Sequence, residues 1–570
     1  MPRYTAAMAI EHRWRDPHAA AVPGPLPAGR LTPGWLRTRV GLGAATALVT
    51  LLALACRGFD LDHVNHVDSP LWFFRTYTFW NALGEGDWGQ TRLAPHPGVT
   101  LMWTMGAALR LFGIGGNGLH PDGLIVAKLP SVLVGVAAAT LTLPLLGRLL
   151  RRDGLLVALV CAVLIATEPQ LIRSSRMVHL DMLATGLAWI GVLCTLGIAA
   201  APRRLALAAG LLFGAAVMAR LSVAPLVAGA GLVLCFDCLR RPPEGVQPWE
   251  PPAIVAGTAT LTCFMMWPAL LADPIGLVTS VVEETQRVVG RGHLGIERGP
   301  EYYLFWALRT LPHETLIGAL LGLPWLVMGA DRDALRRLFF VHLPFAVVIL
   351  LSAKKLSRYL IPALPLVTAL AAYGAVRLLD VSLRRVPARA AVTVALATVV
   401  LLGAGRSLRI AHAHPLVSTC SSWPGRACGP RPAQYYPRTL GLALRDHMPE
   451  RGRPRVYVSN GALCRLMKPW FGCKKIRDPK SVHFIVLRGN DFDRNGERLR
   501  RKAGRKLGSF IMAAEPIVDV LDRGVLRERA YLGPRHRDYR PPPPDQGRRP
   551  RAPPAGQAPV VIRIEQPSTD

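Results

Sequence analysis

Long apolar stretches alternate with short polar stretches along the first 405 residues. A helix needs about 20 apolar residues to cross the hydrocarbon core of a bilayer. Alternation on this scale predicts a polytopic α-helical membrane protein. The apolar stretches cover, approximately, residues 40–56, 99–112, 124–147, 154–170, 181–201, 205–220, 222–238, 251–272, 314–330, 338–353, 359–379 and 390–405.

Short arginine clusters between these stretches predict the orientation of the chain, because Lys and Arg are enriched in cytoplasmic loops. If 99–112 crossed the membrane, five clusters would face outward; if it does not cross, all five face inward. The stretch is also short, so we predict an interfacial or re-entrant helix at 97–112, about eleven transmembrane helices and an extracytoplasmic C-terminus. The clusters are Arg148/Arg151/Arg152, Arg203/Arg204, Arg240/Arg241, Arg332/Arg336/Arg337 and Arg384/Arg385/Arg389.

The two ends of the chain differ from this pattern. Residues 1–34 are rich in Pro, Ala, Arg and Gly and read as a disordered cytoplasmic leader before the membrane domain at 35–405. Strand-like runs at 455–459 and 481–487, with helical stretches around them, predict a small soluble α/β domain at 406–533. Residues 534–570 read as a disordered Pro/Arg-rich tail.

Four cysteines in the predicted outer domain form two close pairs, Cys420/Cys428 and Cys464/Cys473. Neither pair has the tight spacing of a zinc site. Disulfides fit the extracytoplasmic location that the arginines predict independently.

The composition narrows the class of protein. The chain is 51% hydrophobic and 18% charged, yet its formal net charge is +31. A soluble domain has about 25% charged residues, and a nucleic-acid binder gathers its arginines on folded faces rather than between apolar blocks. Abundant Ala, Arg, Gly and Pro suggest a bacterium with a GC-rich genome, so the predicted location is the bacterial plasma (inner) membrane.

The first predicted extracytoplasmic loop is rich in polar candidates. Asp60, Asp62 and Asp68 follow the first span, an amphipathic aromatic helix is predicted at 71–83, and His96-Pro97 opens the interfacial helix. His96 could face a phosphate at a helix N-terminus, or it could simply form a turn with its neighbouring prolines. The acids could line a site or be solvated at the membrane surface.

Cations stand in a second predicted outer turn, where the positive-inside rule expects few of them. Lys354, Lys355 and Arg358 are followed by Tyr359. Arg binds phosphate oxygens in a bidentate manner, Lys supplies a point charge, and Tyr donates from its hydroxyl. Binding of a lipid phosphate therefore competes with the simpler explanation that these side chains snorkel to headgroups.

A third outer segment carries Arg176, His179 and Asp181. Arg176 and Asp181 could face one cavity with His179 between them, although a histidine at the end of a span is often structural. A carboxylate and a histidine could hold a divalent cation, but no spacing here demands a metal, so metal dependence stays open.

Four motifs in order resemble the C-type (GT-C) integral-membrane glycosyltransferases, especially the group of protein O-mannosyltransferases and lipid A aminoarabinose transferases. The first is the acidic loop with its helix and His96-Pro97. The others run Ser174-Ser-Arg-Met-Val-His-Leu-Asp181, Met266-Trp-Pro-Ala-Leu-Leu-Ala-Asp273 and Lys354-Lys-Leu-Ser-Arg-Tyr359. The resemblance covers roughly residues 35–410.

The resemblance implies an inverting hexosyl- or pentosyltransferase. Its donor would be a polyprenyl-phosphate-linked sugar, and its acceptor a hydroxyl of a protein, lipid or glycan outside the membrane. The catalytic base of the family maps to Asp68. The family usually has Asp-Glu here, whereas this chain has Asp68-Ser69, which keeps the base and removes its neighbour. Asp60 or Asp62 would be the base in a shifted register.

Two other classes remain as alternatives. A transporter or flippase of a lipid-linked or anionic substrate would place ionisable groups near mid-span and often shows repeated halves. This sequence concentrates them at span ends and shows no repeat. A scaffolding protein would use the outer domain for assembly, but it gives the aspartate-rich loop no role.

Overall fold

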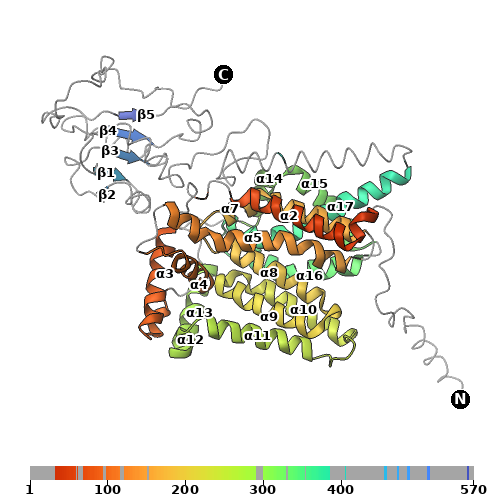
Figure 1. Cartoon of the computed structure of the whole chain (residues 1–570), viewed down its shortest axis with the longest axis horizontal. Helices are drawn as coiled ribbons and strands as arrows, with labels where there is room; N and C mark the ends of the chain where they lie inside the picture. The colour runs from red at the N-terminus through yellow and green to blue at the C-terminus, as the bar shows by residue number, and fades with distance from the viewer. Residues whose placement is uncertain are drawn as a thin grey trace, which may run out of the picture.

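The computed structural model describes residues 32–58, 61, 69–93, 98–115, 121–150, 153–290, 299–328, 331–353, 355–385 and 405, together with five short strands. Up to residue 385 the described residues form helices and turns, gathered in one bundle (Figure 1). The α-helices are α2 Arg39–Gly58, α3 Ser69–Gly84, α4 Val99–Leu111, α5 Pro121–Leu149, α6 Gly154–Thr167, α7 Pro169–Ser175, α8 Asp181–Leu196, α9 Pro202–Ala219, α10 Ala224–Arg240, α11 Glu250–Met266, α12 Ala269–Ala272, α13 Pro274–Gly290, α14 Glu301–Thr310, α15 His313–Gly322, α16 Arg332–Leu351 and α17 Leu364–Arg385.

Short 3₁₀ helices connect several of these elements. They are η2 Gly34–Arg37, η3 Gly89–Thr91, η4 Ile198–Ala200, η5 Leu221–Val223, η6 Leu323–Leu326 and η7 Ser357–Ala363.

Six of the described helical segments are long and apolar enough to cross a membrane, or up to seven if a bent pair is one span. The chain is therefore a multi-pass membrane protein. The outer surface fits this, since α2 exposes Val40 by 83% and Leu51 by 64%. The six segments are Arg39–Gly58, Asp122–Leu149, Pro202–Ala219, Leu221–Arg240, Arg332–Leu351 and Arg358–Asp380.

Proline interrupts two of the stretches that the sequence predicts as spans. The stretch 154–170 is a helix pair, α6 and α7, bent by 56°. Pro169 has no N–H to continue α6, and Glu168 instead caps α7 by accepting from the Leu171 N–H at 2.8 Å. The stretch 314–330 is α15 followed by η6, which contains Pro324.

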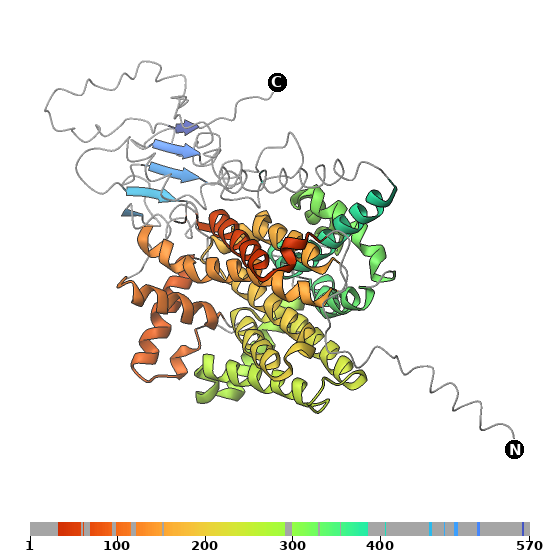
Figure 2. The same ribbon diagram turned by 45° about the vertical axis from the view of Figure 1, so that its right-hand side comes forward.

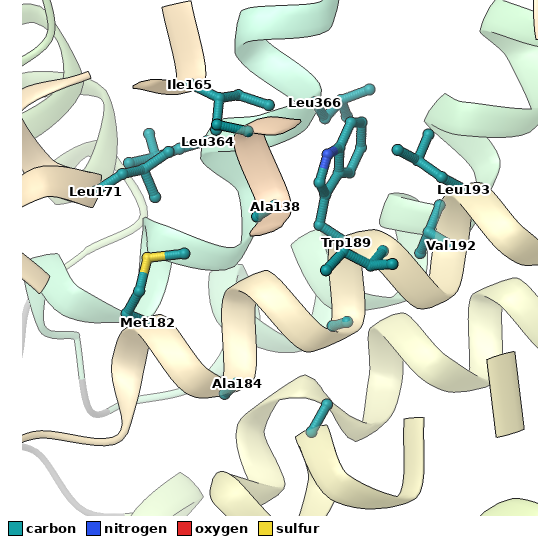
Figure 3. Close-up of a cluster of buried hydrophobic side chains, with 14 of the residues drawn as sticks. Ala138, Ile165, Leu171, Met182, Ala184, Trp189, Val192, Leu193, Leu364 and Leu366 are labelled. Carbon is teal, nitrogen blue, oxygen red and sulfur yellow. The ribbon is translucent and has the colours of Figure 1, made fainter. Parts of the chain in front are cut away.

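Helix α8 lies at the centre of the bundle, and nearly all of its residues are buried. Trp189 on α8 packs among Ala138, Ile165 and Leu366, which come from α5, α6 and α17 (Figure 3). The indole Nε1 donates to Thr142 Oγ1 at 2.8 Å, so the one polar atom of this large side chain is satisfied. A buried central helix fixes the position of its own first residue, Asp181.

Helices α3 and α4 stand side by side at one edge of the bundle (Figures 1 and 2). Helix α3 confirms the aromatic helix predicted at 71–83. Trp80 Nε1 donates to the carbonyl of Met102 at 2.9 Å, and Trp80 also packs against Trp103. Helix α4 has 13 residues and, like α8, is one of the shorter apolar helices, so the non-crossing helix at 97–112 and the count of about eleven spans stay predictions.

The five described strands are β1 Arg455–Val458, β2 Gly472–Cys473, β3 Phe484–Leu487, β4 Phe510–Ala513 and β5 Val561–Arg563. They form one parallel sheet in the order β2-β1-β3-β4-β5. Strands β1 and β3 coincide with the two strand-like runs of the sequence. Of the four cysteines predicted to pair, Cys420, Cys428 and Cys464 lie outside the described residues.

The bundle has two polar ends, which we name after their buried aspartates. The Asp181 end is where α2, α6 and α9 finish and where α8 and α10 begin. The Asp331 end is where α5, α8 and α10 finish and where α16 begins. Residues of the five predicted arginine clusters lie at helix termini of the Asp331 end: Arg148 on α5, Arg203/Arg204 on α9, Arg240 on α10 with Arg241 directly after it, Arg332/Arg336/Arg337 on α16 and Arg384/Arg385 on α17.

Candidate functional site

A chain of polar side chains links three separate elements at the Asp181 end. Asp181, the first residue of α8, contacts His179 and Arg220. His179 Nδ1 lies 2.9 Å from Asp181 Oδ2, and His179 Nε2 lies 3.0 Å from Arg358 Nη1. The order of contacts is therefore Arg220, Asp181, His179, Arg358.

These contacts fix the tautomer of His179. Arg358 is a donor only, so the His179 Nε2 that it faces must accept. The ring proton is then on Nδ1, which faces the Asp181 carboxylate. The distance of 2.9 Å from His179 Nδ1 to Asp181 Oδ2 places this proton next to the carboxylate. Asp181 thereby orients a neutral imidazole beneath a guanidinium.

Arg220 is the second cation of this chain, and it lies in the turn between α9 and η5. Its guanidinium carbon is 4.7 Å from the centre of the Tyr359 ring, which is a cation–π contact. Burial lowers the pKa of Arg220 to about 10, and the nearby Arg358 acts in the same direction. Arg220 stays charged at neutral pH, and two guanidinium groups share this site.

The predicted cation turn continues the same cluster. Lys355 is buried, and its Nζ donates to the carbonyl of Ser352 at 2.5 Å. Arg358 and Tyr359 stand on η7, which leads into α17 and contacts α8. Tyr303 of α14 also lies near Arg220 and Tyr359, and burial raises the pKa of its hydroxyl. Lys354 lies outside the described residues.

Gly98 connects helices α3 and α4 to this end. Its N–H donates to the carbonyl of Met218 at 2.9 Å, two residues before Arg220. Its φ is +124°, and a Cβ at this position would lie 2.4 Å from the Trp72 ring and 3.5 Å from Leu180. Only glycine fits here. The start of α3, the start of α4 and the residue before Asp181 therefore meet at one point.

Lys128 anchors the first loop from the other side. It is fully buried on α5, and its Nζ donates to the carbonyl of Leu61. Leu61 lies between Asp60 and Asp62 in the sequence. Those two residues, Asp68 and His96 lie outside the described residues, but the residues that flank them at 61, 69 and 98 belong to the Asp181 end.

Arg57 and Glu168 form a neighbouring cluster with a structural role. Arg57 donates to the carbonyls of Ile165 and Ala166 at 2.9 and 2.7 Å, and so closes the C-terminus of α6. Its Nε also donates to Ser175 at 3.1 Å. Arg176 is buried close enough to Cys56 for electrostatic interaction, on the Arg57 side of α7. Arg57 and Glu168 therefore hold the bend between α6 and α7.

Buried positive charge exceeds buried negative charge at this end. Among the described residues, its buried cations are Arg57, Lys128, Arg176 and Lys355, and its buried carboxylates are Glu168 and Asp181. The partly buried Arg220 and Arg358 add to the excess. An excess of cations with directed N–H groups is suited to an anion such as phosphate.

The structure brings together His179, Asp181, Lys355, Arg358 and Tyr359, which the sequence places in two separate segments. Arg176 is at the same end but on the Arg57 side. Sequence reasoning missed Arg220 and Lys128. Both lie at or near the ends of apolar stretches on the predicted extracytoplasmic side, where few cations are expected. The same signal identified residues 354–358 in the sequence.

No group of three or more His, Cys, Asp or Glu side chains arranged to hold a metal ion occurs in the described part of the chain. Asp181 and His179 are engaged with arginines.

No protein-family model and no curated protein matches this chain. Several solved structures do resemble it. ArnT from Cupriavidus metallidurans bound to undecaprenyl phosphate is 15% identical with a TM-score of 0.45, and in the apo state 16% identical with a TM-score of 0.47; each likeness covers 77% of this chain and 86% of that one. The Archaeoglobus fulgidus oligosaccharyltransferase tethered with an acceptor peptide is 13% identical with a TM-score of 0.44, covering 77% of this chain and 64% of that one.

Proposed function

We propose that this protein is a membrane glycosyltransferase. It transfers a sugar from a polyprenyl-phosphate-linked donor to an acceptor hydroxyl of a protein, lipid or glycan. The observation that carries the proposal is the cluster of buried and partly buried cations at the Asp181 end, where Arg220, Arg358 and Tyr359 lie together next to the flanks of the aspartate-rich loop. The four sequence motifs add the reaction class.

The cations would bind the donor phosphate. When the bond between C1 of the sugar and the phosphate oxygen breaks, the leaving phosphate gains negative charge, which cations already in place stabilise. Arg358 is the central candidate, because His179 holds one of its Nη groups. Lys354, Lys355, Tyr359 and Arg176 are the further candidates that the sequence supplies.

Asp181 is a positioning residue in this proposal. Its carboxylate is engaged by Arg220 on one side and His179 on the other, so it is poorly placed to accept a proton from an acceptor. It keeps Arg220 in place, and through the imidazole it orients Arg358. His179 passes on this orientation and need not touch substrate.

Asp68 is the proposed general base. An acceptor hydroxyl is a weak nucleophile, and a carboxylate within hydrogen-bond reach must take its proton as the oxygen bonds to C1. The phosphate leaves with the electron pair of the broken bond, and attack from the opposite face inverts the anomeric centre. Asp68 precedes Ser69, the first residue of α3, and the same first turn contains Trp72 against Gly98. Asp60, Asp62 and His96 remain candidates for lining the site.

The proposed orientation puts the Asp181 end and residues 406–533 outside the cytoplasm of a bacterial inner membrane. The arginine-rich termini at the Asp331 end are then cytoplasmic. Single cysteines at Arg148 and at Ser357 would test this with a membrane-impermeant thiol reagent. Labelling at Ser357 alone supports the orientation, and labelling at Arg148 alone reverses it.

The direct test of the reaction is Asp68→Asn, assayed by transfer of radiolabelled sugar from a polyprenyl-phosphate donor in membranes. Transfer should be lost while expression and donor binding persist. Asp87→Asn is the matched control, because Asp87 is an exposed acid of the same loop whose carboxylate is bonded to Gln90. Unchanged transfer by Asp68→Asn would reject Asp68 as the base and direct the test to Asp60 and Asp62.

Mass spectrometry of surface glycoconjugates in a deletion strain would identify the acceptor and the sugar. A glycoconjugate that loses one sugar residue is the expected result. No change in any glycoconjugate, with a changed distribution of lipid-linked sugar across the membrane, would instead indicate transport.

A further inference from the structure

A cavity lies at the Asp331 end, away from the proposed catalytic site. Its volume is about 890 Å³, and α8, α10 and α16 line it together with the turn before α16. A volume of this size is within the range of pockets that hold small molecules, roughly 300–1,000 Å³. Helices α10 and α16 supply most of its lining, and both are long and apolar enough to cross a membrane.

One part of the cavity lining is apolar. Leu196, Leu232, Phe236 and Leu343 are among its lining residues. Leu232 and Phe236 on α10 are exposed by 67% and 53%, so this apolar surface continues onto the outer face of the bundle. An acyl chain could therefore enter from the bilayer without crossing a polar barrier.

Another part of the cavity lining is basic. Arg240, Arg241, Arg336 and Arg337 line it along with three aspartates, and each aspartate already has a cation partner. Arg337 pairs with Asp237 at 3.1 Å, Arg377 with Asp331 at 2.9 Å and Arg332 with Asp333 at 3.7 Å. Among the described residues no carboxylate lies within 4.0 Å of Arg240 or Arg241, and Arg336 uses its Nε on the carbonyl of Leu326.

We propose that this cavity binds an anionic phospholipid of the bilayer. Arg240, Arg241 and the Nη groups of Arg336 face the phosphate, and the apolar lining holds the upper part of an acyl chain. The charge left over after pairing is positive, which favours an anionic over a zwitterionic headgroup. This lipid site is separate from the donor site, because it lies at the opposite end of α8 and α10.

Part of the basic charge has a simpler explanation, and the experiment must distinguish this explanation from lipid binding. Arginines at the C-terminus of α10 interact favourably with the helix dipole, and Arg240 also lies over the Phe236 ring at 4.1 Å. A purely structural or topological role predicts no preference for a bound lipid. Binding selectivity is therefore the decisive readout, rather than stability.

The experiment is native mass spectrometry of the full chain in detergent, titrated with phosphatidylglycerol or phosphatidylethanolamine. The wild type should retain phosphatidylglycerol in preference. Arg240→Gln/Arg241→Gln should weaken its apparent affinity roughly ten- to thirty-fold, since each arginine near a lipid phosphate contributes about 1 kcal/mol. The matched control is Arg148→Gln/Arg204→Gln, which removes two exposed arginines from the same end outside the cavity and should leave the affinity unchanged.

Two further binding measurements on the wild type distinguish a lipid site from a site that binds phosphate alone. Phosphatidylglycerol with long acyl chains should bind more tightly than a short-chain form, and glycerol phosphate alone should not compete. Equal retention of the two headgroups, or equal weakening by the control variant, would overturn the proposal. So would competition by glycerol phosphate at the concentration of the lipid.

Discussion

The two polar ends of the bundle use buried charge in opposite ways. At the Asp331 end one buried cation, Arg377, faces three buried carboxylates, Asp153, Asp331 and Asp380. Among the described residues of the Asp181 end, buried cations outnumber buried carboxylates. Burying a charge is costly unless a partner in the fold or a bound ligand compensates it. The carboxylates of the Asp331 end share Arg377 and accept further hydrogen bonds from Tyr373 and Thr32, whereas the cations of the Asp181 end are suited to an anion that comes from outside.

The buried polar contacts of the Asp331 end join segments that are far apart in the sequence. Asp331 Oδ2 accepts from Arg377 at 2.9 Å and from the Tyr373 hydroxyl at 3.1 Å. Asp153 accepts from the N–H of Thr32 at 3.0 Å, before α2. The network therefore joins the segment before α2, the start of α6, the start of α16 and the body of α17. Its carboxylates are held within the protein, and we expect it to stabilise without taking part in transfer.

The largest expected effect is on stability, from Arg377→Met. The change leaves three buried carboxylates without their shared cation, which should cost about 3–5 kcal/mol of unfolding free energy. Thermal unfolding in detergent measures the loss. Protein that remains folded should transfer sugar at the wild-type rate per molecule. A selective loss of transfer with normal stability would contradict the structural role of this end.

The reciprocal change at the Asp181 end is Arg358→Gln. Removing one charge that stabilises a transition state typically lowers the rate about 10²- to 10³-fold. Thermal unfolding should change little, because Asp181 keeps its partner Arg220. Arg358→Lys should restore part of the rate, since it returns the charge without the bidentate geometry. If Arg358→Gln unfolds the protein and folded molecules stay active, the two ends do not differ as proposed.

Much of this comparison could be predicted from the sequence. The hydrophobic pattern predicts helices where α2, α5, α9, α10, α16 and α17 lie, and the arginine clusters predict which of their ends come together. The motifs select His179 and Arg358, which are 179 residues apart and 3.0 Å from each other in the structure. Each was chosen for its local position, because a cation or a polar side chain stood at the end of an apolar run.

The partners of these residues could not be predicted in the same way. That His179 accepts from Arg358 and that Asp181 engages Arg220 depends on how α8, η5 and η7 pack, and no local pattern encodes it. Arg57 directly follows the apolar stretch 40–56, and only the structure shows that it closes the C-terminus of α6. Asp153, Asp331 and Arg377 lie far apart in the sequence, so their network was equally hidden.

A smaller effect is expected from Gly98→Ala, which strains the junction of α3 and α4 at the Asp181 end. A residue with a Cβ at φ +124° costs about 1–3 kcal/mol, and the Trp72 ring must also move. Stability and transfer should both fall, since the start of α3 follows Asp68. Gly43→Ala on α2 is the control, because a Cβ there meets nothing within 4 Å and alanine favours a helix. Equal effects of the two changes would show that Gly98 holds nothing in place.

The smallest effect is expected from an ion pair that belongs to neither buried network. Arg203 Nε lies 2.5 Å from Glu250 Oε1 at the exposed start of α9 and α11. The hydrogen bond from Arg203 lowers the pKa of Glu250, so any stabilisation is present above the normal pKa of a glutamate, about 4.3, and is lost as the pH falls below it. Solvent and salt screen such a pair. Glu250→Gln should therefore leave the melting temperature at pH 7 unchanged within error, in low and in high salt alike. A clear destabilisation at pH 7 that disappears at low pH would show that this exposed ion pair also stabilises the fold. Burial would then not distinguish the charges that contribute to stability from those that do not.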